Sequence, residues 1–224
     1  MYEMNSNNQV TLCGEIVSEF QFSHEVFGEK FYIVTLGMPR NSGNAEDRIP
    51  CMVSERLMDV SKNYIGTNIL FKGQYRSFNK EVDDKKRLDL TLFVREYELH
   101  NQSGSLLVVN YALLDGYIVK PPVYRKTPKG REIADLLIAV NRPYGKSDYI
   151  PCICWGRNAR FASFMRVGDH ITLDGRIQSR EYMKKFSDEK IVPMIAYEVS
   201  ISKLLYSEEE AVWDSQSIIA VLQS

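Results

Sequence analysis

The side chains that could do chemistry in this sequence gather on two strand-like runs of its second half. Alternation along a strand places Arg176, Arg180 and Tyr182 on one face. By the same rule Tyr149 and Trp155, six residues apart, share a face of another strand. Cations beside flat rings are poor material for a core, but they suit an electrostatic track with a stacking platform. The pattern therefore favours binding over a reaction.

Patterns typical of catalysis are missing from the sequence. We find no Gly-rich phosphate loop, no metal-ligand spacing and no nucleophile–base signature. The three histidines are scattered, and no C-x-x-C pair occurs among the four cysteines, Cys13, Cys51, Cys152 and Cys154. We therefore expect no enzyme, no cofactor and no metal site, and we interpret the cysteines as buried, reduced thiols.

The charge of the chain is divided unevenly along its length. The net charge is −1, which by itself argues against a polyanionic partner. Residues 106–206, however, carry 16 basic and 10 acidic side chains, whereas residues 1–105 carry 12 and 15. The positive charge is therefore concentrated in the second half, as a phosphate-binding surface requires.

The chain repeats itself at a spacing of about 102 residues. The clearest matches are Ile49-Pro50-Cys51 with Ile150-Pro151-Cys152, Gly14 with Gly116, Gly28 with Gly130, and Gly73 with Gly175. A repeat of this length indicates two copies of one domain rather than a solenoid, whose units have about 20–50 residues. We predict a first domain at 1–102, a short polar linker, a second domain at 106–206, and an acidic, amphipathic tail at 207–224.

Each copy is predicted to consist mainly of strands. In the second copy they are expected near 110–120, 131–141, 149–155, 170–182 and 191–204. One helix is expected between the third and fourth strands, at 158–165. This is the order of the OB fold, a small five-stranded barrel. We therefore predict an all-β protein of two tandem OB-fold barrels with one short helix each, and a short helical tail. Gly73 and Gly175 are expected where a strand bends sharply.

Four segments of the second copy resemble the bacterial single-stranded DNA-binding protein family, in that family's order and spacing. The segments are 124–130, 137–142, 150–157 and 175–182. The resemblance implies a protein that binds single-stranded DNA with little sequence preference and protects it in replication, recombination or repair. It also implies that Tyr149, Trp155 and Tyr182 stack on bases while arginines and lysines contact phosphates.

The predicted DNA-binding surface extends beyond these three rings. Basic residues lie around the first hairpin turn, at the next loop and beyond Tyr182, and the loops of an OB barrel are where its ligand is usually held. The full set of predicted contacts is Tyr149, Trp155, Tyr182, Tyr124, Arg125, Lys126, Lys129, Arg142, Arg157, Arg176, Arg180, Lys184 and Lys185.

The first copy keeps the glycines of the second but not its three rings. Its residues at the stacking positions are Arg48, Ser54 and Lys80. Because this copy is also net acidic, we expect a weak DNA binder whose role is partly structural. Arg76 and Phe78, together with Arg48 and Lys80, could still extend a DNA path.

Two further expectations concern location and assembly. The first residues lack the positive start and apolar run of a signal peptide, and no apolar stretch is long enough to cross a bilayer. We therefore expect a cytoplasmic, nucleoid-associated protein. Members of the family typically assemble four OB barrels, so the resemblance implies a homodimer of two-barrel chains.

Residues 207–224 depart from the family pattern. The family usually ends in a long flexible linker and an acidic tip that recruits replication and repair enzymes. Here three glutamates at 208–210 favour a helix start, and an apolar stripe follows. We expect this helix to pack on the barrels, mediate dimerisation or dock a dedicated partner. The departure suggests a specialised relative, such as one serving a mobile element or a phage.

Two other functions stay open. The chain could be an OB-fold protein-interaction module of a primosome-like assembly. Weak DNA binding that is insensitive to Trp155→Ala, with tight capture of a helicase or primase component, would favour that function. It could also bind single-stranded RNA, because the sequence shows no reader for the 2′-hydroxyl group.

Overall fold

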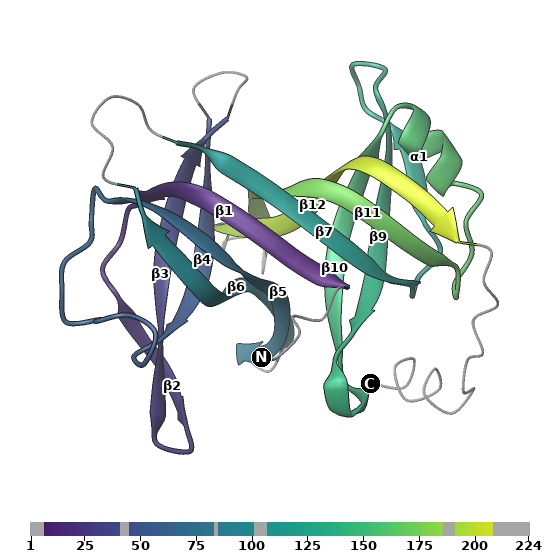
Figure 1. Ribbon diagram of the computed structural model, residues 1–224. Coiled ribbons are helices and arrows are strands. Elements are labelled where there is room, and N and C mark those ends of the chain that lie inside the picture. Colours follow the sequence, from purple (N-terminus) through teal and green to yellow (C-terminus); the bar gives the residue numbers. More distant parts are fainter. Residues whose placement is uncertain (1–6, 41–44, 83–84, 101–106, 186–190, 208–224) are drawn as a thin grey trace.

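The computed structural model describes residues 7–40, 45–82, 85–100, 107–185 and 191–207, and it is mostly β-sheet (Figure 1). The strands of the first half are β1 (Asn8–Ile16), β2 (Gln21–Val26), β3 (Glu29–Pro39), β4 (Glu46–Ser54), β5 (Asn68–Val82) and β6 (Lys85–Leu99). Those of the second half are β7 (Val109–Ile118), β8 (Val123–Lys126), β9 (Glu132–Asn141), β10 (Ser147–Trp155), β11 (His170–Lys185) and β12 (Ile191–Ser207). The second half also holds the 3-10 turn η1 (Pro143–Gly145) and the helix α1 (Arg157–Ala162). The predicted all-β class is confirmed.

Each half closes into a barrel. In the first half the pairing runs from β1 through β3, β4, β6 and β5 back to β1. In the second half it runs from β7 through β9, β10, β12 and β11 back to β7. The pairings β4–β6 and β10–β12 are parallel, and the other pairings of these rings are antiparallel. This is the OB arrangement, so the prediction of two tandem barrels is confirmed.

The domain boundaries stay a prediction. The elements β1–β6 fall within the range predicted for the first domain, and β7–β12 fall within that of the second, except that β12 extends to Ser207. The predicted helix of the tail lies outside the described residues.

A short extra strand accompanies each barrel. β2 and β8 form hairpins with β3 and β9, and the sequence patterns did not predict either strand. Each hairpin turns at a glycine with positive φ, Gly28 at 75° and Gly130 at 77°. This backbone conformation is open to glycine at little steric cost. The recurrence of these two glycines in the repeat thus has a conformational cause.

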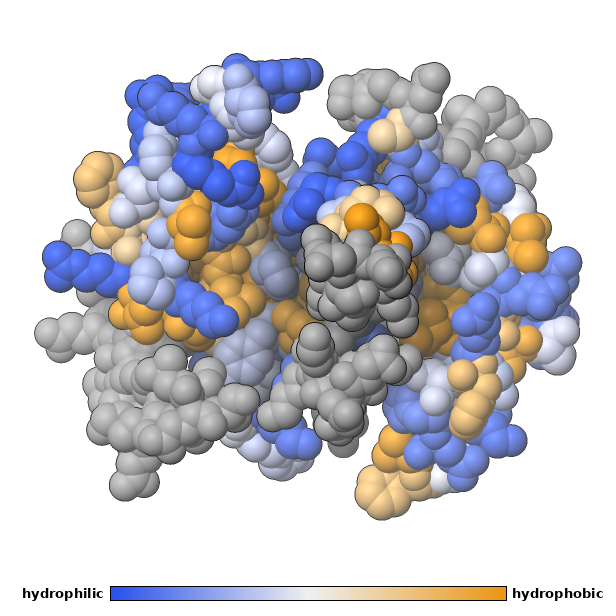
Figure 2. All heavy atoms as spheres, turned by 180° about the vertical axis from the view of Figure 1, so that it is seen from behind, coloured by the Kyte–Doolittle hydropathy of each residue, from blue (hydrophilic) through white to orange (hydrophobic). Residues whose placement is uncertain are grey.

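Alternation along the strands fills the two barrel interiors. Phe71, Tyr75 and Leu92 lie in the first interior, and Ile150 and Ile177 lie in the second. Apolar side chains outside the core are interspersed with polar ones on the face seen in Figure 2.

Gly73 and Gly175 mark the bends of the long strands β5 and β11, as predicted. The register of β5 against β6 shifts between Lys72 and Gly73, and that of β11 against β12 shifts between Asp174 and Gly175. A Cβ atom on Gly73 would lie 2.0 Å from the Phe93 carbonyl oxygen. No side chain fits at that distance, so the close strand approach requires glycine.

The prediction of one helix per repeat is wrong for the first copy. Helix α1 is present in the second copy, but the equivalent segment 55–67 of the first forms only turns. The side chain of Asp59 accepts a hydrogen bond from the Ser61 backbone N–H at 3.2 Å, and Asn63 accepts one from Ile65 at 2.9 Å. Such local bonds compete with helical hydrogen bonding. Among the described residues, no helix is long and apolar enough to cross a membrane.

The two barrels share a continuous sheet through β1 and β7 (Figure 1). These strands pair antiparallel over six positions, from Asn8 opposite Leu114 to Cys13 opposite Val109. Two asparagines flank the seam in the same way. The side chain of Asn8 bonds both backbone groups of Tyr75, and that of Asn110 bonds both backbone groups of Ile177. The halves are therefore related by an approximate twofold arrangement.

The four cysteines are free and buried, as predicted. Burial raises the pKa of the Cys13 thiol to about 11 and that of the Cys154 thiol to about 12. Both thiols are therefore protonated, and poorly nucleophilic, at neutral pH.

Candidate nucleic-acid interface

Trp155 lies at the end of β10 on the outer face of the second barrel. Its ring nitrogen Nε1 donates a hydrogen bond to Ser200 Oγ on β12 at 3.2 Å. The ring nevertheless keeps 39% of its surface exposed. The hydrogen bond fixes one edge of the indole while its surface stays accessible, which suits a stacking platform.

Tyr182 and Arg180 lie on the same outer face, on β11, which is separated from β10 by β12. Arg176 on β11 is opposite Ser200, the residue that holds Trp155, and Tyr182 is opposite Met194. Along β12 these two positions are six residues apart, about 20 Å at the rise of a strand. The Arg180 guanidinium lies 5.9 Å from the centroid of the Tyr182 ring. The register agrees with the expectation that Tyr182 shares a face with Arg176 and Arg180. The contact of Trp155 and Tyr182 with DNA stays a prediction.

Tyr149 lies at the junction of the two barrels. Its backbone N–H donates to Ser77 Oγ of the first barrel at 2.8 Å, and its side chain is half-buried. It shares one face of β10 with Trp155, because Ile150, Cys152 and Cys154, which point the other way, lie in the core. Its ring is less available for stacking than the other two.

The hairpin of β8 and β9 holds four of the predicted contacts. The Tyr124 hydroxyl donates to Glu132 Oε1 at 2.7 Å, and Arg125 is paired with Asp135 at 2.8 Å. The bond to Glu132 raises the pKa of Tyr124. The remaining two residues, Lys126 and Lys129, are exposed. The lysines therefore offer the more available positive charge of this hairpin.

Arg142 and Arg176 are engaged between the barrels. Arg142 bonds Asp148 of its own barrel through Nε at 2.5 Å and the Ser77 carbonyl of the other through Nη2 at 3.1 Å. Arg176 reaches Asp47 of the first barrel at 3.3 Å. The sequence could not show these partners, because they become neighbours only when the barrels assemble. Both arginines hold the barrels together, and their predicted DNA contact is untested.

The last three predicted contacts differ in how far the structure describes them. Arg157 is exposed at the first position of α1. Lys184 and Lys185 continue β11 beyond Tyr182 and pair with Val192 and Ile191 through the backbone.

The first barrel carries aromatic rings that position-by-position comparison with the second barrel missed. Phe93 on β6 occupies the position of Ser200, and Ser54 occupies that of Trp155. Phe93 contacts Phe31 of β3 with 5.8 Å between ring centroids, and the Arg95 guanidinium lies 4.7 Å from the Phe93 centroid. In the second barrel the large ring is on β10 and the small residue on β12, whereas in the first barrel the ring is on β6 and the small residue on β4. Comparing neighbouring strands, rather than equal positions, could have found this.

The remaining residues at the stacking positions of the first barrel carry charge. Arg48 is exposed and paired with Glu46 at 2.8 Å. The side chain of Lys80 lies outside the described residues. Although the first barrel has no ring at these three positions, the Phe31–Phe93 pair gives this face an aromatic surface.

The fold and this face define a tandem OB-barrel protein with a candidate single-strand surface. Residues 109–202 match the profile described as "Single-strand binding protein family". This match confirms the resemblance that the sequence of the second repeat shows to that family.

Curated relatives support this assignment over the second repeat. The single-stranded DNA-binding protein of Oceanobacillus iheyensis is 37% identical over 82 residues, covering 34% of this chain and 51% of the relative. Single-stranded DNA-binding protein A of Bacillus subtilis is 35% identical over 82 residues, covering 34% and 48%. The chain thus spans about half the length of the curated relatives it matches.

A solved structure shows the same fold over both repeats. Wild-type single-stranded DNA binding protein from Thermus aquaticus aligns with a TM-score of 0.69 at 19% identity. The alignment covers 94% of this chain and 97% of that one. The tandem architecture is therefore a known arrangement.

Proposed function

We propose that this protein binds single-stranded DNA with little sequence preference, through base stacking and phosphate contacts and without catalysis. The observation that carries the proposal is the outer face of the second barrel. There Trp155 is held by Ser200 with its ring exposed, on the same side as Arg180 and Tyr182. The relatives matched over this repeat are named single-stranded DNA-binding proteins.

The proposed mechanism follows from the chemistry of this face. Every base has a flat π-face, so stacking on Trp155 and Tyr182 is tolerant of sequence and contributes about 1–3 kcal/mol per base. Exposed cations such as Arg180, Lys126 and Lys129 neutralise phosphates, so binding weakens as salt rises. A duplex binds poorly, because its bases are already stacked on one another.

Fluorescence anisotropy of a labelled oligo-dT of about 30 nucleotides tests the proposal. Trp155→Ala and Tyr182→Ala are each expected to weaken binding roughly 5- to 150-fold, the equivalent of one lost stack. Phe164→Ala is the matched control, since it removes an exposed ring beyond α1. Equal affinity for duplex and single strand, or equal effects of all three variants, would overturn the proposal. The same titration with oligo-rU distinguishes DNA from RNA.

The biological setting is part of the proposal. As the family resemblance implies, the protein would protect single strands in replication, recombination or repair, as a cytoplasmic, nucleoid-associated protein. A homodimer would unite four barrels, as the family resemblance implies. Sedimentation analysis of the full chain, with and without oligo-dT, checks the dimer. A monomer under both conditions would exclude it.

A further inference from the structure

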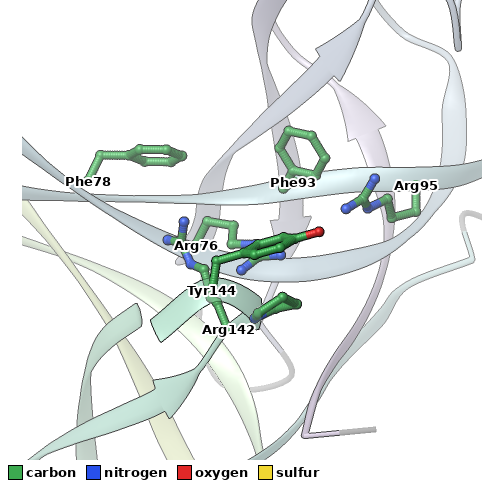
Figure 3. Close-up of a pocket in the computed structure, with 7 residues that line it drawn as sticks. Arg76, Phe78, Phe93, Arg95, Arg142 and Tyr144 are labelled. Atoms are coloured by element: carbon green, nitrogen blue, oxygen red, sulfur yellow. The ribbon is translucent and has the colours of Figure 1, made fainter. Parts of the chain in front are cut away.

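A pocket of about 320 Å³ lies where η1 of the second barrel meets β5 and β6 of the first (Figure 3). Its volume falls at the lower end of the range of small-molecule sites, about 300–1,000 Å³. Both barrels contribute to its lining, which consists of Arg76, Phe78, Phe93, Arg95, Arg142, Pro143 and Tyr144. Three cations and three rings thus meet at one opening.

The rings of the pocket are available to a ligand. Tyr144 is 99% exposed and has a positive φ of 65°, a conformation that is uncommon for a bulky residue. Phe78 lies beneath Arg142, with 6.0 Å between the guanidinium and the ring centroid, and Phe93 lies beneath Arg95. Stacked guanidinium and aromatic groups are a frequent setting for bases.

The pocket carries an excess of positive charge. Arg76 and Arg142 both pair with Asp148, which is fully buried. Arg95 adds a third cation, and the described residues give it no ion-pair partner. Asp89, opposite Phe78 on β6, is not part of the lining. Burial lowers the pKa of Arg76, and the neighbouring charges of Arg142 and Arg95 lower it further against the effect of Asp148.

The site related to this pocket by the approximate twofold arrangement contains a different set of residues. There Asp47 pairs with Arg40 and Arg176, as Asp148 pairs with Arg142 and Arg76. A second carboxylate, Glu198, joins this cluster, where it bonds Gln178 at 2.6 Å and lies 4.0 Å from Arg180. Hydrogen bonding to Asp47 raises the pKa of Arg40.

The ring positions differ as well. In place of Phe78, Phe93 and Arg95 the second barrel has Arg180, Ser200 and Ser202. Holding the barrels together requires only the shared part, one carboxylate with two arginines. The uncompensated charge and the rings on one side therefore need another explanation, and an anionic ligand with a flat group supplies one.

We propose that this pocket binds one nucleotide unit of a single strand as the strand passes from the second barrel onto the first. Arg95, Arg76 and Arg142 face the phosphate, and Tyr144, Phe78 or Phe93 stacks on the base. The proposal rests on the single-strand binding proposed above. It makes the first barrel a contributor to long single strands through residues that have no counterpart in the second.

Oligo-dT of two lengths tests the pocket, because one OB barrel covers about 4–16 nucleotides. Arg95→Ala and Tyr144→Ala are expected to weaken binding of a strand of about 30 nucleotides about fivefold or more and to leave one of about 10 nucleotides unchanged. Trp155→Ala should weaken both. The controls are Lys62→Ala, an exposed cation of the first barrel outside the pocket, and Phe27→Ala, an exposed ring at the β2–β3 turn.

The outcomes separate this inference from the general function. Pocket variants that bind both lengths like wild type, or lose affinity equally for both, overturn the inference while single-strand binding stands. Failure of the wild-type protein to bind either length refutes the function itself. Tight binding of dTMP, abolished by Arg95→Ala while strand binding is unchanged, assigns the pocket to free nucleotides and overturns the strand path. Photocrosslinking of 5-iododeoxyuridine in the longer strand is expected to label Tyr144, Phe78 or Phe93.

Discussion

Trp155 owes its orientation to one small neighbour. A serine at position 200 leaves room for the indole across β12 and accepts the hydrogen bond from its Nε1. In the first barrel the ring belongs to Phe93, and the small residue is Ser54. In both barrels a large ring on one strand thus lies beside a small residue on the next.

Loss of the Ser200 hydroxyl is expected to loosen the indole without removing it. A neutral hydrogen bond contributes about 0.5–1.5 kcal/mol, so Ser200→Ala should weaken oligo-dT binding roughly two- to tenfold. Anisotropy titration measures this change. Ser202→Ala, two residues further along β12, is the control and should bind like wild type. An unchanged affinity for Ser200→Ala would show that packing alone orients Trp155.

At the scale of the elements, the bends of β5 and β11 are set by glycine. A Cβ atom on Gly73 would lie 2.0 Å from a backbone carbonyl oxygen, and one on Gly175 would lie 2.6 Å from the equivalent oxygen. Backbone cannot move aside as a flexible side chain can. Both barrels therefore depend on the glycine, the first one more strictly.

Alanine substitutions at Gly73 and Gly175 should show which barrel depends more strictly on its glycine. Overpacking costs about 1–3 kcal/mol and occasionally more. Gly73→Ala is expected at or beyond the upper end of that range and Gly175→Ala within it, as measured by urea unfolding. Gly145→Ala is a control for backbone strain alone, because it has positive φ and nothing within 4 Å of the added Cβ. A larger loss for Gly175→Ala would contradict the steric reason.

Local patterns in the sequence predicted most of the elements. Alternation located the long strands, and Gly73 and Gly175 located their bends. The prediction of a helix failed at 55–67, where Asp59 and Asn63 form turns instead. Their side chains compete for backbone hydrogen bonds, and this competition leaves no mark on the spacing of the apolar residues. The short strands β2 and β8 carry mostly exposed side chains, so no alternation marked them.

At the scale of the whole molecule, the two barrels form one body through β1, β7 and two buried carboxylates. The partner that each carboxylate has in the other barrel is far away in sequence: Arg76 is 72 residues from Asp148, and Arg176 is 129 residues from Asp47. No periodicity connects such positions. The sequence therefore predicted arginines on an outer face, but it could not show that some of them face the neighbouring barrel.

The clusters around Asp148 and Asp47 differ in the charges that would surround the arginines if the carboxylate were lost. Without Asp148, Arg76, Arg142 and Arg95 would be left close together around the pocket, and Arg76 is largely buried. Without Asp47, Arg40 would still have Glu198 nearby. An unpaired buried charge is far more costly than a paired one.

Asp148→Asn is therefore expected to destabilise the protein more than Asp47→Asn. Breaking a buried ion pair typically costs about 3–5 kcal/mol, and Asp148→Asn should fall in this range while Asp47→Asn falls below it. Urea unfolding at fixed salt measures both, with Asp59→Asn as a control for an exposed pair that should change stability little. Added oligo-dT should restore stability to Asp148→Asn more than to Asp47→Asn, because phosphates can neutralise the three guanidinium charges that line the pocket. Equal losses, with equal recovery, would mean that Glu198 does not balance its cluster and that the charge asymmetry behind the pocket is absent.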